Sequence, residues 1–207
     1  MRITKYGHSC ILVEEGGLRI LIDPGNFVFM DGKVKPEDFK NIDIVLLTHE
    51  HQDHTFIDAL KIIVQNNHPN IITNKSVGKA LKESGIPFQE HAGNLPIKLI
   101  DCPHGLLPEG LTAPENTGFL IGGKFLHPGD CIAPREHVTP EILSLPVIAP
   151  WVTLRDAISY AKRVNPKAII PIHDGFLKYP DFINGIIRYA WPDVPLQGTE
   201  IGKPFEI

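Results

Sequence analysis

A dense cluster of histidines and acids directly follows an apolar segment, and this pairing limits the possible folds of the chain more than any other feature. Residues 48–54 read Thr-His-Glu-His-Gln-Asp-His, after a run of Ile, Val and Leu within residues 42–47. Such a run has the length and composition of a buried strand. Polar rings and carboxylates at the end of a buried strand need hydrogen bonds, ion pairs or a cation. Residues two apart in an extended segment point to the same side, so His49 and His51 can bind one metal ion together.

Asp53 and His54 lie one step further along, where the chain turns into a predicted helix, and can face a second ion. Imidazole nitrogen and carboxylate oxygen suit zinc, manganese or iron, whereas calcium prefers an all-oxygen cage. The alternative interpretation is a solvated polar loop. The density of His and Asp immediately after a buried strand favours the metal site.

The same arrangement recurs later in the chain. Three further apolar runs each lead to a residue of a metal-binding type: His104 after residues 97–101, Asp130 after residues 124–126 and His173 after residues 168–172. Pro or Gly near these positions stiffens or turns the chain, which helps a rigid sheet hold ligands in place. Taken singly, each histidine would be interpreted as a core or surface residue. As a set, these residues predict one metal centre assembled from several strand ends.

Apolar periodicity predicts both strands and helices throughout the chain. Short runs closed by Pro, Gly or polar residues predict strands at residues 11–13, 18–22, 42–47, 70–73, 97–101, 118–121, 124–126, 147–149 and 168–172. Helical spacing and capping residues predict helices at residues 53–65, 75–84, 154–164 and 181–190. Both halves mix the two, which favours an α+β fold of two sheets with helices on their outer faces. No repeat or linker divides the chain, so one domain over residues 1–207 is expected.

Charge and cysteine usage exclude several classes of protein. The 20 Lys and Arg against 24 Asp and Glu give a net charge of −4, which disfavours nucleic-acid binding and stable membrane association. Three cysteines without a CxxC pair do not resemble a disulfide framework, and the start of the chain has no apolar leader segment. We therefore expect a cytoplasmic protein with a small-molecule substrate, and self-association stays open.

The order of these residues resembles a known superfamily. The pattern His49, His51, Asp53 and His54, followed by His104, Asp130 and His173, is similar to that of the metallo-β-lactamase superfamily. Leu-Ile-Asp-Pro-Gly at residues 21–25 resembles the first motif of that superfamily. Gly-His-Ser at residues 7–9 is similar to its branch of small metal-dependent hydrolases related to L-ascorbate-6-phosphate lactonase and the N-acyl-phosphatidylethanolamine phospholipase D.

The resemblance implies a four-layer αββα sandwich of two mixed β-sheets flanked by helices, with a dinuclear metal site at one edge. Carried over to this sequence, it implies a first metal bound by His49, His51 and His104, a second bound by Asp53, His54 and His173, and Asp130 bridging both. Zinc is favoured, with manganese and iron as alternatives. Two such ions can share a water as hydroxide, and the two catalytic carboxylates, Asp53 and Asp130, would orient it.

Several positions stay open. Asp23 either accepts a hydrogen bond from a metal-binding imidazole or is a plain turn residue before Pro24. Cys131 stands where the superfamily usually has Thr or Ser, and a role for His8 is undecided. The apolar loops at residues 26–30 and 106–111 are interpreted as a wall beside the metals, a dimer contact or core packing.

These features predict a metal-dependent hydrolase acting on a small ester, lactone or phosphorylated metabolite. One alternative is a phosphodiesterase acting on a phospholipid or a nucleic-acid end, which would need a basic or membrane-facing rim. The other is a redox or non-catalytic metal-binding protein, because a fold does not determine a function.

Overall fold

Two mixed β-sheets form the centre of the protein. The computed structural model describes residues 1–207. The first sheet has the strand order β11-β1-β2-β3-β4-β5, and the second has the order β10-β9-β8-β7-β6. The first sheet consists of β1 (Arg2–Gly7), β2 (Cys10–Glu15), β3 (Leu18–Ile22), β4 (Ile44–Leu46), β5 (Asn70–Ile72) and β11 (Pro204–Glu206). The second consists of β6 (Ile97–Asp101), β7 (Thr117–Ile121), β8 (Phe125–His127), β9 (Ile142–Pro146) and β10 (Ala168–Ile172).

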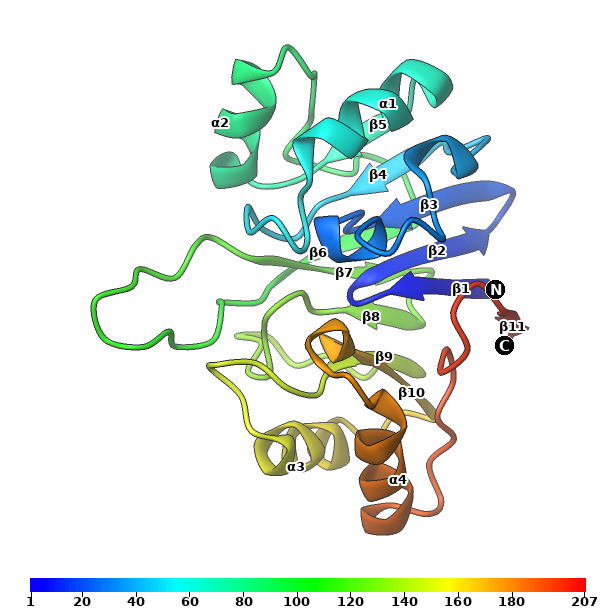
Figure 1. Cartoon of the computed structure of the whole chain (residues 1–207), viewed down its shortest axis with the longest axis vertical. Coiled ribbons are helices and arrows are strands. Elements are labelled where there is room, and N and C mark those ends of the chain that lie inside the picture. Colours follow the sequence, from blue (N-terminus) through cyan, green and yellow to red (C-terminus); the bar gives the residue numbers. More distant parts are fainter.

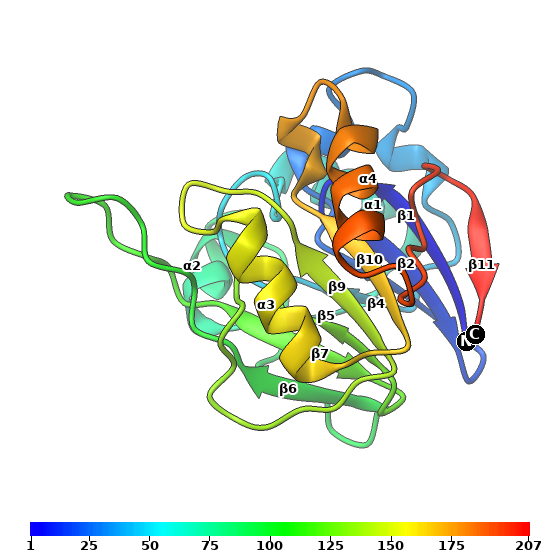
Figure 2. The ribbon, with the colours of Figure 1, turned by 90° about the horizontal axis from the view of Figure 1, so that it is seen from below.

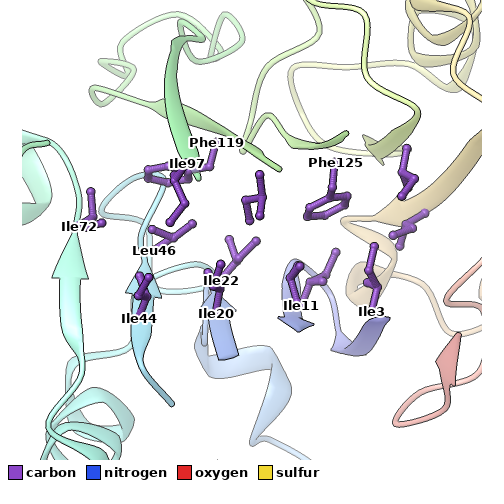
Figure 3. Packing of buried hydrophobic residues seen from close by; sticks show 14 of the residues in the cluster. Ile3, Ile11, Ile20, Ile22, Ile44, Leu46, Ile72, Ile97, Phe119 and Phe125 are labelled. Atoms are coloured by element: carbon purple, nitrogen blue, oxygen red, sulfur yellow. The ribbon is translucent and has the colours of Figure 1, made fainter. Parts of the chain in front are cut away.

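The inner faces of the two sheets pack on each other through a layer of aliphatic and aromatic side chains (Figure 3). Alternate residues of β3 divide between the two faces of the first sheet, because successive side chains of a strand point to opposite sides. Ile20 and Ile22 join this inner layer, whereas Leu21 belongs to a separate cluster on the outer face. Such burial on both faces requires a second apolar layer outside each sheet.

Four helices supply the outer layers. α1 (Ile57–Asn67) and α2 (Lys75–Glu83) place Leu60 and Val77 in the cluster on the outer face of the first sheet. α3 (Leu154–Val164) and α4 (Pro180–Ala190) place Ala157 and Ile187 in the corresponding cluster of the second sheet. The two helix pairs lie at opposite ends of the view in Figure 1, and Figure 2 shows α3 and α4 side by side with the second sheet behind them. The predicted four-layer αββα sandwich is therefore confirmed.

Two predicted elements differ from those observed. The helix predicted from residue 53 begins at Ile57, because the backbone N–H groups of His54 and Thr55 both donate to the carbonyl of His51 in a tight turn, at 2.9 and 2.8 Å. The strand predicted at residues 147–149 is wrong, since β9 ends just before it. Ser144 and Pro146 interrupt the apolar pattern of β9, so the pattern did not predict this strand, although every residue of β9 is buried.

Two further strands, in addition to β9, were not predicted. β1 carries a fully buried lysine, Lys5, whose charge disguises the strand pattern. β11 is a short, partly exposed edge strand that pairs antiparallel with β1, so the two ends of the chain lie side by side (Figure 1).

None of the helices is long and apolar enough to cross a membrane. The loop between β6 and β7 reaches out from the body as a long arm, and Leu106 and Leu111 on it are exposed rather than packed in the core (Figure 1).

Candidate metal centre

The seven residues predicted to bind metal come together at one edge of the two sheets. The loop after β4 carries four of them, and the segments after β6, β8 and β10 carry one each. Together with His8, which was not among the predicted ligands, they form two groups whose ligand-type atoms lie within 4.8 Å of one another: His49, His51, His104 and Asp130 in the first group, and His8, Asp53, His54 and His173 in the second. Strand ends on adjoining sheets thus bring together residues that are up to 124 positions apart in the sequence (173 − 49).

Asp130 lies between the two groups. Its Oδ2 is 3.3 Å from His104 Nε2 and 3.8 Å from His49 Nε2, whereas its Oδ1 is 3.1 Å from His54 Nε2 and 2.5 Å from His173 Nε2. One carboxylate therefore faces the first group with one oxygen and the second group with the other.

Asp23 and Thr48 determine which ring nitrogens of two histidines are free. Asp23 is fully buried and accepts from the Thr48 backbone N–H at 2.8 Å, from Thr48 Oγ1 at 2.7 Å and from His54 Nδ1 at 2.7 Å. The Thr48 hydroxyl gives its only proton to Asp23, so it accepts from His49 Nδ1 at 3.0 Å. Both imidazoles therefore donate from Nδ1, which directs Nε2 toward the ligand groups as the atom that a metal can bind. Asp23 therefore accepts a hydrogen bond from a histidine of the metal-binding loop, which is the first of the two alternatives predicted for it.

His104 is arranged in the same way. Its Nδ1 donates to the carbonyl of Gly105 at 2.7 Å, and its Nε2 is buried without a hydrogen-bond partner. Gly105 has no side chain because a Cβ there would lie 2.1 Å from the ring of Trp151. Trp151 packs against the imidazoles of His104 and His173 and donates its Nε1–H to Asp130 Oδ2 at 3.1 Å. This tryptophan lies in a turn between β9 and α3, and no motif or spacing in the sequence indicated its role.

His8, whose role was undecided from the sequence, lies beside the second ligand group. It lies in the turn between β1 and β2 with a φ of 46°, is 2% exposed, and its Nε2 donates to Asp53 Oδ2 at 3.0 Å. The ring of Phe27 stacks on it at 4.7 Å. A non-glycine residue with positive φ is uncommon and often marks a functional position. The sequence signal for His8 was the Gly-His-Ser triplet at residues 7–9, which resembles a motif of one branch of the superfamily.

The charges of the site follow from burial and the mixture of imidazoles and carboxylates. Burial opposes ionisation of Asp130, but His173, His54 and His49 outweigh it and hold the pKa of the carboxyl well below its usual range. Burial lowers the pKa of His49 well below its usual value, and burial lowers the pKa of His8 to about 4 against the opposing effect of Asp53. At His54, burial is outweighed by Asp130 and Asp23, which hold the pKa of the imidazole well above its usual value. The edge therefore combines anionic carboxylates with neutral imidazoles at His8 and His49 and a proton on His54 that a divalent metal would displace on binding.

The donor set fits divalent cations. His54 Nε2 lies 3.1 Å from Asp130 Oδ1 and 2.9 Å from His173 Nε2. His49 Nε2 is 3.1 Å from His51 Nδ1. Ring nitrogens and carboxylate oxygens that converge in this way repel one another unless a proton or a cation lies between them, and Asp130 Oδ1 and His104 Nε2 are buried without hydrogen bonds. Nitrogen and carboxylate ligands of this kind suit zinc, manganese or iron.

His127 and the three cysteines lie outside the two ligand groups. His127 is buried and donates from Nε2 to the carbonyl of Ser9 at 3.0 Å. Cys10, Cys102 and Cys131 are free and buried. Cys131 packs in the cluster beneath α3, and its Sγ accepts a hydrogen bond from the Ala133 backbone N–H at 3.3 Å. This thiol therefore points into the core.

The fold and the two ligand groups define the class of a metal-dependent hydrolase with the metallo-β-lactamase fold, and comparison with known proteins agrees. The beta-lactamase superfamily domain matches residues 2–173, so the chain belongs to that superfamily. A UPF0173 metal-dependent hydrolase of Ligilactobacillus salivarius is 28% identical over 232 residues, covering 100% of both chains. Another, of Thermoplasma volcanium, is 31% identical over 193 residues, covering 84% of this chain and 83% of its own.

A solved structure has the same fold. Igni18, a metallo hydrolase from Ignicoccus hospitalis, superimposes with a TM-score of 0.75 at 22% identity, over 100% of this chain and 98% of its own. The predicted superfamily and the prediction of a metal-dependent hydrolase are confirmed. The likeness to the branch of the ascorbate-phosphate lactonase and the phospholipase D stays a prediction.

Proposed function

We propose that the protein binds two divalent ions, with zinc favoured, and hydrolyses a small ester, lactone or phosphorylated metabolite in the cytoplasm. The observation that carries this proposal is the position of Asp130, whose Oδ2 faces the first ligand group and whose Oδ1 faces the second. The free state of the three cysteines supports a reducing compartment.

The first ion would be held by His49, His51 and His104, the second by Asp53, His54 and His173, and Asp130 would bridge them. When bound, two such ions lower the pKa of a shared water and stabilise negative charge that develops on the substrate oxygen. This chemistry requires no serine or cysteine nucleophile, which agrees with three cysteines buried in the core.

The protein's own groups hold the reacting centre in place. His8 Nε2–H donates to Asp53 Oδ2 at 3.0 Å and fixes the orientation of the carboxylate. The Trp151 indole N–H does the same for Asp130 Oδ2. Fixed carboxylates of this kind can orient a nucleophile without reorganising during the reaction.

The test is hydrolysis by chelator-treated protein reloaded separately with zinc, manganese or iron. The panel contains a lactone, a thioester, p-nitrophenyl acetate, p-nitrophenyl phosphate and bis-p-nitrophenyl phosphate. We expect turnover of at least one ester, lactone or phosphate monoester that is lost on chelation and in Asp130→Asn, but kept in Asp58→Asn, whose carboxylate is exposed on α1. Turnover of bis-p-nitrophenyl phosphate alone would instead support the phosphodiesterase, and no metal-dependent turnover would contradict the proposal.

A further inference from the structure

A cavity of about 370 Å³ lies directly beside the second ligand group. Most of its wall is apolar, from residues 26–34, the start of α4 and the turn before β11: Phe27, Val28, Val34, Leu177, Pro180 and Ile201. Ligand sites are typically concave and mostly apolar, with a few polar groups at one end.

His8 connects this cavity to the metal centre. Its ring lines the cavity, while its Nε2 donates to Asp53 Oδ2 in the second group. Phe27 stacks on one side of the ring at 4.7 Å, and Phe176 meets it edge-on at 5.0 Å. Gly175 leaves room for the imidazole, because a Cβ there would lie 2.7 Å from His8 Nδ1. A molecule in the cavity would therefore contact an aromatic cluster that also touches the second group.

The charged residues of the cavity are already paired. Lys33 binds Asp31 at 2.9 Å, and Asp174 accepts from the buried Lys5 at 2.5 Å. Lys33 is the only cation of the wall and its side chain is 83% exposed, so no buried Lys or Arg lines the cavity to neutralise a phosphate. The same segments also expose apolar side chains, with Ile201 53% and Phe176 49% accessible.

We propose that this cavity receives an uncharged apolar or aromatic group of the substrate, so that the enzyme prefers neutral esters or lactones carrying such a group over phosphorylated metabolites. The inference rests on the proposed hydrolytic function and narrows its substrate class. Burial of a substrate methylene in an apolar cavity is favourable in itself, and none of the polar groups of the wall demands a charged partner.

A kinetic comparison tests the preference. The metal-loaded enzyme is assayed with p-nitrophenyl acetate, p-nitrophenyl hexanoate and p-nitrophenyl phosphate. Four additional buried methylenes should raise kcat/KM for the hexanoate over the acetate by between about 10-fold and about 200-fold. We expect both esters to exceed the phosphate. Equal values for the two esters, or a preference for the phosphate, would overturn the inference while leaving hydrolysis intact.

Variants connect the preference to this cavity. Val34→Trp fills it, and Ile201→Glu places a charge at its rim, so each should bring the hexanoate-to-acetate ratio toward one. Ile207→Glu is the matched control, because it changes an exposed isoleucine outside the cavity and should keep the wild-type ratio. If Ile201→Glu changes the oligomeric state in sedimentation and leaves the ratio unchanged, the face is an interface between copies and the inference is wrong.

A binding measurement separates this inference from the proposed function. p-Nitrophenyl hexyl ether resembles the ester but is not hydrolysed. Titrated into methyl-labelled protein, it should shift the NMR signals of Val28, Val34, Leu177 and Ile201 and leave Ile207 unchanged. These shifts without turnover of any ester or phosphate would contradict the proposed function and support the cavity as an apolar binding site. The absence of shifts would overturn the inference whatever the enzyme hydrolyses.

Discussion

Replacing Asp23 with asparagine tests whether one buried carboxylate determines the ring nitrogen that His54 offers to a metal. Asp23 accepts three hydrogen bonds, two from Thr48 at 2.8 and 2.7 Å and one from His54 Nδ1 at 2.7 Å. An amide keeps one acceptor oxygen and adds an N–H donor where a second acceptor stood. If His54 accepts from that amide at Nδ1, its own proton moves to Nε2 and the lone pair facing Asp130 is lost.

The expected magnitude follows from the hydrogen bonds removed. Loss of a hydrogen bond to a charged group costs about 1.5–3 kcal/mol. Disturbing the hydrogen-bond partner of a metal-binding imidazole typically lowers metal affinity about 10- to 100-fold, which corresponds to about 1.4–2.8 kcal/mol. We therefore expect Asp23→Asn to release one metal ion 10- to 100-fold more readily than the wild type.

The assay is competition for the bound metal by a chromophoric chelator, with circular dichroism to show that the variant is folded. Asp58→Asn is the matched control, because its side chain is 78% exposed on α1 and should leave both affinities unchanged. If Asp23→Asn keeps both affinities within twofold of this control, the carboxylate does not select the His54 nitrogen and the assignment of the lone pairs is wrong.

Three further perturbations follow from the same contacts. Trp151→Phe removes the indole donor to Asp130 and should weaken metal retention or activity about 10- to 100-fold, against no change in Trp191→Phe; equal behaviour of the two variants would contradict this. Lys5→Met leaves a carboxylate without its buried partner and should lower the free energy of unfolding by about 3–5 kcal/mol in urea denaturation; a loss under 1 kcal/mol would contradict it. In metal-free protein the His8 pKa of about 4 lies below its unfolded value near 6.5, so the unfolded chain binds more protons between these two pH values. The free energy of unfolding should therefore decrease by up to about 3 kcal/mol as the pH is lowered from about 6.5 to about 4, and His8→Gln should lack this part of the decrease.

The metal-binding loop could be predicted from the sequence because its signal is local. The strand before His49 is purely apolar, and the ligand-type residues follow it at once. His104, Asp130 and His173 likewise come shortly after recognisable strands, and β6, β8 and β10 run in the same direction, so their carboxyl ends lie at the same edge of the sheet. The sequence pattern was therefore sufficient to predict both the fold class and seven of the eight residues in the two groups.

The remaining features depend on contacts between distant segments. His8 gains its position only when the β1–β2 turn packs against Asp53, 45 residues later in the chain. Trp151 reaches Asp130 through a turn that follows an unrecognised strand. Lys5 breaks the apolar alternation of β1, and the compensating partner lies 169 residues away. Periodicity and spacing in the sequence do not predict these distant partners. The hydrogen bonds and ion pairs that stabilise His8, Trp151 and Lys5 form only when the chain is folded.

The two ligand groups also explain why the site can stay rigid. The imidazoles of His49, His54 and His104 direct Nε2 toward the ligand groups, and each is oriented by a hydrogen bond from Nδ1. The acceptors are Thr48, Asp23 and the Gly105 carbonyl, respectively. Fixed partners of this kind reduce the reorganisation needed when a metal or substrate binds.

Metal content per chain is the most direct test of two ions bridged by Asp130. The measurement is elemental analysis of protein purified without chelator, and again after reloading with zinc, for the wild type and Asp130→Ala. We predict about two ions per chain in the wild type and a clear decrease in the variant, because each oxygen of Asp130 faces one ligand group. One ion or none in the reloaded wild type, unchanged by the substitution, would contradict the two-metal site and its bridge.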